Sequence, residues 1–310
     1  MPVRVGVVIP VYNRAALAVE AFGHVCAQTR APDRLAIVDD GSTDDTEARL
    51  AAALAEMKPA FDVEVIQQTN AGASAARNRG AEAVGDCDVI AFYDSDDIWP
   101  ADFLARAAAA FDGVGEDVVA VSSDRLDRSE ATGESELVGC DDVPADAAER
   151  FFAVGTPITS ATAVRRQAFW DAGGFDAKVV CHNDTDLFLR MCVRGKWGYL
   201  PGLPVVIRRD TGEAHLTDGL RSMALRIEIA HVLDRFIHDA GGRDVLPAKV
   251  WRVALSRRWQ RVGRGLLRRG ENGQAAWCFR RSLTIARWRP KAWLLRAMTS
   301  GTEPVRPGRL

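Results

Sequence analysis

Apolar residues in the first 120 positions gather into short, nearly continuous runs with amphipathic stretches between them. Such runs are typical of strands buried on both faces, and they cover residues 3–9, 35–38, 63–66, 89–93 and 118–121. The stretches between them have helical periodicity and cover residues 15–27, 43–57, 74–84 and 100–111. Strands and helices that alternate at this spacing predict βαβ units. We therefore expect a Rossmann-like α/β fold, with a mostly parallel central sheet flanked by helices.

The pattern changes twice after this region. Residues 124–150 are acidic and short of large apolar side chains, which indicates loops with a short helix near residues 145–152, and residues 156–216 return to mixed strand and helix. From residue 219 the periodicity is helical. One apolar face contains Leu220, Ala224, Ile227, Ala230, Leu233 and Ile237, and a basic helical pair follows near residues 247–269 and 273–287. We therefore predict a domain at residues 1–218 and a basic α-helical C-terminal region at residues 219–310.

The composition is that of a globular protein, with 47% hydrophobic and 26% charged residues. No apolar run reaches the roughly 18 residues that span a bilayer. The first residues have the pattern of a strand and its turn rather than that of a signal peptide. The six cysteines are irregularly spaced, which argues against a zinc cluster and against a disulfide scaffold. We therefore expect a cytoplasmic protein.

The net charge of −2 conceals a strong asymmetry. Residues 242–310 contain 17 lysines and arginines but only three acids, a net charge of +14, so the remainder of the chain carries −16. A chain divided in this way usually has two functional regions.

Polar side chains follow the ends of the predicted strands, where open parallel sheets bind their ligands. Tyr12 follows the first run and can stack on a nucleobase, or it can be only a turn residue. Asp40 follows the second run and can accept an N–H of a base, or it can belong to a tight turn. Arg77 lies among small residues that let a ligand approach, and it can contact a phosphate or stay on the surface of an alanine-rich helix.

The densest polar cluster is the segment FYDSDD, which ends the fourth run and contains Asp94, Ser95, Asp96 and Asp97. Three carboxylates within four residues repel one another, and a divalent cation bound with a diphosphate would compensate for this repulsion. Mg²⁺ and Mn²⁺ prefer one or two carboxylates together with phosphate oxygens and water. Such a metal would act as a Lewis acid on a departing diphosphate. The alternative is an acidic turn at the start of the next helix.

Two further acids, Asp184 and Asp186, precede a predicted amphipathic helix. A carboxylate at this position can remove the proton of an acceptor hydroxyl as a general base. Both acids could instead only stabilise the positive end of the helix.

Taken together, these segments resemble the family 2 glycosyltransferases. The matching segments, in the order of the family, are VVIPVYNR, IVDDGSTDDT, NAGASAARNRG, FYDSDDIWP, GGFDA and NDTDLFLRM, within residues 3–207. The resemblance implies the GT-A fold, with a nucleotide-sugar half at about residues 1–123 and an acceptor half at about residues 124–218. It also implies an inverting, metal-dependent transfer of a sugar from a nucleoside diphosphate sugar.

The resemblance also implies roles for single residues. The contacts to the nucleoside would come from Pro10, Tyr12 and Asp40, and the arginine on the nucleotide side would be Arg77. The DxD motif that handles ribose, diphosphate and Mn²⁺ or Mg²⁺ would be Asp94, Ser95 and Asp96, with Asp97 beside it. The general base would be Asp184.

Two departures from the family pattern concern the acceptor side. The family usually has Glu-Asp before the acceptor-side helix, whereas this chain has Asn183 and Asp184, so a helper carboxylate is lost and the base is kept. The family often has an arginine and a histidine after the last strand, and this chain has Arg208, Arg209 and His215 there. We include His215 as a candidate metal ligand, with a surface histidine as the alternative.

Two other functions compete with glycosyl transfer. A non-catalytic nucleotide-sugar-binding protein would not need Asp94, Asp96 and Asp184, all of which are present. A nucleotidyltransferase of similar fold would need a glycine-rich, basic loop after the first strand, and PVYNR contains no glycine. The arginines and tryptophans of the tail could bind nucleic acid, but their helical spacing favours packing, and we expect no nucleic-acid partner.

The acceptor is left open by the sequence, and a glycan, a glycolipid, a small molecule or a peptide all fit. The basic helices could dock on the inner face of an anionic membrane or hold an anionic acceptor such as a lipid-linked pyrophosphate. They could also recruit a peptide acceptor or form a homodimer interface.

Overall fold

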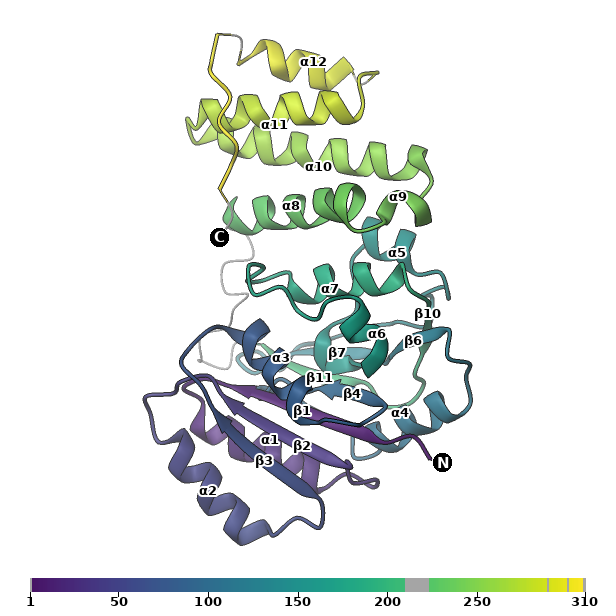
Figure 1. Ribbon diagram of the computed structural model, residues 1–310. Helices are drawn as coiled ribbons and strands as arrows, with labels where there is room; N and C mark the ends of the chain where they lie inside the picture. Colours follow the sequence, from purple (N-terminus) through teal and green to yellow (C-terminus); the bar gives the residue numbers. More distant parts are fainter. Residues whose placement is uncertain (1, 210–222, 289, 300, 309–310) are drawn as a thin grey trace. The chain divides into compact units, whose positions relative to one another are not determined.

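The computed structural model describes residues 2–209, 223–288, 290–299 and 301–308 (Figure 1). The chain forms two compact units. The first unit is made of Met1–Ala147, Thr156–Lys178 and Arg194–Glu213, and the second of Ala148–Gly155, Val179–Val193 and Ala214–Leu310. His215, Leu220 and the predicted domain boundary at residue 218 lie outside the described residues.

The first unit contains a seven-stranded sheet with the order β10-β6-β9-β4-β1-β2-β3. Its strands are β1 (Val5–Val11), β2 (Arg34–Asp39), β3 (Asp62–Gln67), β4 (Val89–Phe92), β6 (Val118–Ser122), β9 (Thr162–Arg165) and β10 (Lys196–Tyr199). All neighbours are parallel except where β9 runs antiparallel between β4 and β6. The prediction of a mostly parallel α/β sheet is therefore confirmed, and each of the five predicted strands forms.

Helices cover both faces of this sheet (Figure 1). They are α1 (Ala15–Cys26), α2 (Thr46–Met57), α3 (Ala73–Ala83), α4 (Phe103–Asp112) and α6 (Arg166–Asp171). The main core lies between the sheet and the α1 and α4 side, where Val7, Ile9, Phe22 and Phe103 are fully buried. On the other face α3 comes very close to β1, because a Cβ at Gly80 would lie 2.3 Å from Val8 Cγ1. Only glycine fits at this contact, and it brings the start of α3 to the carboxyl ends of the strands.

A second, four-stranded sheet has the order β5-β11-β7-β8. Its strands are β5 (Asp97–Ile98), β7 (Arg125–Ser129), β8 (Ser135–Val138) and β11 (Val205–Arg209). The sequence predicted loops over residues 124–150, and this prediction is wrong for β7 and β8. Most of their side chains are polar and none of them is fully buried, so they lack the apolar signal of a buried strand.

The second unit is helical. Its helices are α5 (Ala148–Ala153), α7 (Asn183–Cys192), α8 (Met223–Asp239), α9 (Gly242–Val245), α10 (Ala248–Arg268), α11 (Asn272–Ile285) and α12 (Pro290–Ala297). The helices α8, α10, α11 and α12 lie in successive layers (Figure 1). Trp259 is fully buried, and its ring lies 5.1 Å from that of Trp277. Gly263 lets α11 approach, since a Cβ there would lie 2.5 Å from Phe279.

No helix in the described part of the chain is both long enough and apolar enough to cross a bilayer.

Candidate active site

The loops after β1 and β2 are joined to each other by hydrogen bonds. The backbone N–H of Asn13 donates to Ser42 Oγ at 2.8 Å, and the N–H of Thr43 donates to Asn13 Oδ1 at 2.7 Å. Asn13 has a φ of +51°, a left-handed conformation that asparagine tolerates better than most residues. Pro10 is half-buried in β1, and Tyr12 is 46% exposed. The phenol of Tyr12 is therefore accessible to a ligand at this edge of the sheet.

Asp40, directly after β2, is buried and holds the loop that leads into α3. Its carboxylate accepts hydrogen bonds from Gln68 Nε2 at 2.7 Å and from the N–H groups of Ala71 and Gly72, both at 2.8 Å. Gly41 follows with a φ of +77°, and a Cβ there would lie 2.8 Å from the backbone nitrogen of Asn70. The buried carboxylate thus fixes the turn at the start of α3.

Arg77 on α3 reaches the predicted DxD motif. Its Nη2 donates to Asp94 Oδ1 at 2.6 Å, and its side chain is only 6% exposed. The guanidinium also lies 5.3 Å from the ring centre of Phe175. Asn78, the next residue, exchanges two hydrogen bonds with the backbone of Phe175, at 2.8 and 2.9 Å. The GGFDA segment therefore holds α3 and Arg77 in place.

A different arginine pairs with Asp96. Arg14, at the start of α1, donates from Nη1 to Asp96 Oδ2 at 2.7 Å. Arg208 on β11 donates from Nε to the backbone oxygen of Asp96 at 2.7 Å and also pairs with Glu20 at 3.0 Å. We predicted that a divalent cation bound with a diphosphate would compensate for the repulsion of the carboxylates, and in the structure Arg14 and Arg77 already pair with two of them. Arg14 had no predicted role, because only the fold brings it to Asp96.

Asp97 is the most buried acid of the motif. Burial, followed by the charges of Asp96 and Asp94, raises the pKa of Asp97 well above its ordinary value. Its side chain is hydrogen-bonded to that of Ser160, and its backbone pairs with Ile207 of β11. Ser95 is also buried. Asp94 and Asp96 are therefore the more accessible carboxylates of the three.

A buried scaffold orients this motif. Tyr93 is fully buried, and its hydroxyl donates to the backbone oxygen of Asp97 at 2.8 Å. Its ring stacks on that of Trp99 with centres 4.2 Å apart. The fully buried Ser160 accepts the N–H of Asp94 at 3.0 Å, and its backbone oxygen accepts Trp99 Nε1 at 2.7 Å. Sequence reasoning missed Ser160, because no local pattern marks a residue that acts across 66 positions.

The structure allows a test of whether these residues suit a divalent cation. Among the described residues, no three His, Cys, Asp or Glu side chains gather into a metal cage. The accessible carboxylates of Asp94 and Asp96 still match the one or two protein ligands that Mg²⁺ takes when phosphates and water complete its shell. The residues therefore suit a cation that arrives with a diphosphate rather than one held by protein alone.

Asp184 belongs to the second unit, in the first turn of α7. It is half-buried, and its Oδ1 accepts the N–H of Thr185 at 2.6 Å. Asp186 has a different environment. It is buried and forms ion pairs with Arg190, at 2.6 Å, and with Arg235 of α8. Of the two acids singled out by the sequence, Asp186 is thus structural.

A buried glutamate positions the start of α7. The carboxylate of Glu228, on α8, accepts the backbone N–H groups of Val180, Cys181 and His182 at 2.8, 3.1 and 3.1 Å. Glu228 is only 3% exposed. Three consecutive backbone N–H groups just before the helix would otherwise lack a hydrogen-bond partner, and the carboxylate of Glu228 supplies one for each of them. Sequence reasoning missed Glu228, which looks like an ordinary residue of a helix.

The chain is similar to proteins of known family over much of its length. The family model described as Glycosyl transferase family 2 matches residues 6–173, more than half of the chain. An uncharacterized glycosyltransferase of Rickettsia conorii is 39% identical over 97 residues. That match covers 31% of this chain and 15% of the relative, so the chain spans a small part of that protein.

Solved structures are similar over almost the whole chain. Staphylococcus aureus TarS 1–349 in complex with UDP gives a TM-score of 0.67 at 16% identity, covering 96% of this chain and 88% of TarS 1–349. The mannosyltransferase PcManGT from Pyrobaculum calidifontis, in complex with GDP-Man and Mn²⁺, gives a TM-score of 0.59 at 20% identity, covering 97% and 86%. These similarities confirm the predicted fold class, GT-A with a helical C-terminal region.

Proposed function

Because the chain belongs to glycosyl transferase family 2, we propose that it transfers a sugar from a nucleoside diphosphate sugar to an acceptor hydroxyl, with inversion at the anomeric carbon. The observation that carries the proposal is the array of carboxylates and guanidiniums at the carboxyl ends of the strands, formed by Asp94, Asp96, Arg14 and Arg77. Ligands of open α/β sheets bind at this edge.

In this proposal the nucleoside lies against Pro10 and Tyr12, with Asp40 on the side of the base. The exposure of Tyr12 supports a stacking role. The role of Asp40 is more specific, because two of its three hydrogen bonds come from the backbone before α3. Its carboxylate then shapes the loop that faces the nucleotide as well as offering a lone pair to a base.

The diphosphate is bound by charges that are already in place. Arg77 and Arg14 are close to the carboxylates that they neutralise, and a diphosphate would give both guanidiniums a second anionic partner. Mn²⁺ or Mg²⁺, when bound by Asp94 and Asp96 with the diphosphate, supplies Lewis-acid stabilisation of the leaving group. Asp97, buried behind them, fixes the backbone of the motif. Fixed charges of this kind stabilise a transition state without reorganisation.

Asp184 acts as the general base. Its carboxylate takes the proton of the acceptor hydroxyl while the acceptor oxygen forms a bond to the anomeric carbon. The bond between that carbon and the diphosphate oxygen breaks, and the electron pair leaves with the diphosphate. The half-buried position of Asp184 in the first turn of α7, with Glu228 fixing the residues before it, suits a base that must stay in one orientation.

A donor screen tests the proposal. The purified protein is incubated with UDP-, GDP- and dTDP-sugars and Mn²⁺ or Mg²⁺, and release of the nucleoside diphosphate is measured. We expect release from one donor, loss of release with a chelator, and loss in Asp96→Ala. Asp45→Ala is the matched control, since Asp45 is an exposed acid paired with Arg49.

Each other outcome has a defined meaning. Metal-dependent nucleotide binding without release from any donor means that an acceptor is required for turnover. No release and no metal-dependent nucleotide binding by calorimetry would remove the enzyme proposal and leave a non-catalytic binding module. Release that is equal in Asp96→Ala and the control would remove the DxD assignment.

The C-terminal helices support a second part of the proposal, a peripheral contact with an anionic membrane. The exposed apolar side chains Trp288, Trp293, Leu294 and Met298 lie on or beside α12, in the most basic part of the sequence. Aromatic and basic residues together favour the headgroup region of anionic lipids. Co-sedimentation with phosphatidylglycerol vesicles, but not with phosphatidylcholine vesicles, is the expected result.

A further inference from the structure

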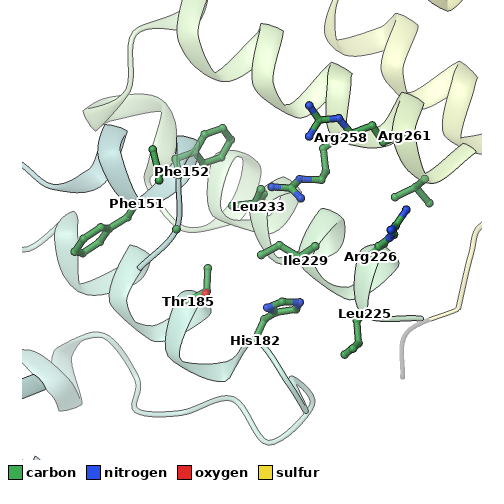
Figure 2. A pocket seen from close by; sticks show the side chains of 13 residues that line it. Phe151, Phe152, His182, Thr185, Leu225, Arg226, Ile229, Leu233, Arg258 and Arg261 are labelled. Atoms are coloured by element: carbon green, nitrogen blue, oxygen red, sulfur yellow. The ribbon is translucent and has the colours of Figure 1, made fainter. Parts of the chain in front are cut away.

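A cavity of about 520 Å³ lies within the second unit, between α5, α7, α8 and α10 (Figure 2). Its apolar wall is formed by Phe151, Phe152, Leu225, Ile229, Leu233 and Val262. Three arginines line it as well, Arg226 from α8 and Arg258 and Arg261 from α10, together with His182 and Thr185 from the start of α7. The volume lies in the range of sites for small ligands.

Some arginines of the second unit have carboxylate partners. Arg190 and Arg235 pair with Asp186, Arg281 pairs with Asp234, and Arg269 pairs with Glu271. Within residues 2–209 and 223–308, as far as these are described, no carboxylate pairs with Arg226, Arg258 or Arg261. The fold thus supplies anionic partners for those four arginines, whereas the three that line the cavity have none among the described residues.

Arg258 is the cavity arginine whose charge is least well solvated. It is half-buried, and burial together with the neighbouring charge of Arg261 lowers its pKa from the ordinary value. A guanidinium that is partly desolvated beside a like charge is unfavourable unless an anion compensates for it. A phosphate ester suits this site better than a carboxylate, because it offers more oxygens and more charge to several guanidiniums.

The cavity borders the proposed base. His182 and Thr185, which line the cavity, stand on either side of Asp184 in the sequence, and Thr185 Oγ1 lies 3.3 Å from Asp184 Oδ1. An anchor in the cavity would therefore hold its molecule next to the carboxylate that takes the proton from the acceptor.

We propose that this cavity binds a phosphate ester carried by the acceptor, with Arg226, Arg258 and Arg261 as its ligands. The phosphate is a binding handle and takes no part in bond making. The apolar wall accommodates the carbon chain next to it. This inference rests on the proposed function, because it names the class of acceptor for the same reaction.

Two probes separate the sources of such an ester. Glycerol 3-phosphate represents a water-soluble phosphate ester, and octyl phosphate below its micelle concentration represents a lipid phosphate. Binding of each to the full chain is measured by calorimetry for the wild type, Arg258→Gln and Arg261→Gln. The matched control is Arg264→Gln, an exposed arginine on α10 that does not line the cavity.

We expect at least one probe to bind, with an affinity about 10- to 100-fold lower in Arg258→Gln and unchanged in Arg264→Gln. Arg258→Lys should recover part of the affinity, since it keeps the charge but not the planar fork. Equal binding of both probes indicates a soluble ester, and tighter binding of octyl phosphate indicates a lipid phosphate. The exposed Arg261 makes Arg261→Gln a second test should Arg258→Gln fail to fold.

Two results would overturn the inference. One is absence of binding of both probes at millimolar concentration, and the other is equal affinity in Arg258→Gln, Arg261→Gln and Arg264→Gln. Nucleotide release measured on the same samples separates this failure from that of the proposed function. If nucleotide release persists but neither probe binds, only the proposal of a phosphate anchor is overturned. If a probe binds but no nucleotide binds, only the proposal of glycosyl transfer is overturned.

Discussion

The candidate site of the first unit and the arginine-lined cavity of the second unit differ in how their charges are compensated. In the first, the accessible acids of the DxD motif each have an arginine at 2.6 to 2.7 Å, so the carboxylates are matched before any ligand binds. In the second, the cavity beside α7 brings together three arginines with no carboxylate partner among the described residues. The first unit is thus an assembled electrostatic site that a cation and diphosphate can enter. The second is the cavity for which we propose an anionic ligand.

Under the proposed function, the nucleotide and the acceptor would be bound by two different arrangements of charge. Matched charges in the first unit keep the motif stable and oriented without its ligand, because buried carboxylates that lack partners are costly. Of the three arginines at the cavity of the second unit, Arg226 and Arg261 are exposed and Arg258 is half-buried, so Arg258 is the one for which a bound anion would compensate partial desolvation. Variants of the two units should therefore separate effects on nucleotide from effects on acceptor.

The largest effect should come from Asp184→Asn. The amide keeps the shape of the side chain but cannot take a proton, so we expect kcat to fall by about 10²- to 10⁴-fold. The affinity for the nucleoside diphosphate, measured by calorimetry, should stay the same, since its proposed ligands lie in the first unit. A kcat within threefold of the wild type would contradict the base assignment.

Arg77→Gln should weaken the first unit. The change leaves Asp94 without its cation, and we expect about 1–3 kcal/mol of lost stability and weaker nucleotide binding. Thermal unfolding and calorimetry measure the two effects. Arg79→Gln is the matched control, because Arg79 lies on the same helix but is exposed and pairs only with Glu82. Equal effects of the two substitutions would mean that the buried pair has no special role.

Glu228→Gln should lower the stability of the second unit and the kcat, although in the proposed mechanism Glu228 does not contact the substrate. The amide oxygen can keep one or two of the three backbone hydrogen bonds, and we expect a loss of about 1–2 kcal/mol in the free energy of unfolding. Because Glu228 positions the start of α7, kcat should fall while the KM of the donor stays the same. A change in donor KM with unchanged kcat would contradict this positioning role.

The smallest effect concerns His24 in the first unit, whose Nδ1 lies 2.8 Å from the hydroxyl of Tyr93. Burial lowers the pKa of His24 below its ordinary 6.5, against the opposing charge of Glu20. The stability that neutral His24 contributes is therefore present above pH 6.5 and is lost as the pH falls from 6.5 through the lowered pKa. We expect His24→Gln to lose less stability between pH 7 and pH 5, by under about 1 kcal/mol. Parallel curves for both proteins would rule out this linkage.

The sequence predicted the central sheet well, for a physical reason. Parallel strands are buried on both faces, so β1, β2, β4 and β6 appear as short apolar runs with helices between them. β7 and β8 have mostly polar and partly exposed side chains, and β7 pairs with the distant strand β11, which its own pattern does not predict. The antiparallel insertion of β9 likewise depends on the path of the chain and not on its residues.

As with the fold, only part of the candidate site was predictable from the sequence. Asp94, Asp96 and Asp97 stand together in the sequence, and a strand end with three acids is a signal in itself. Arg14, Ser160 and Glu228 carry no such signal, because each acts on a group 46 or more positions away. The role of a residue that works through a distant partner cannot be seen until the chain has folded.

The sequence by itself determined the family resemblance, the order of strands and helices in the first half, and the uneven distribution of charge. These properties depend on local periodicity, on adjacent motif residues and on counting. Tertiary structure alone decided which charges meet. It placed Arg14 and Arg77 on the acids of the predicted DxD motif, and it placed Arg226, Arg258 and Arg261 around a cavity where no described acid pairs with them. Electrostatic interactions act over a few ångströms in space, and the fold sets those distances.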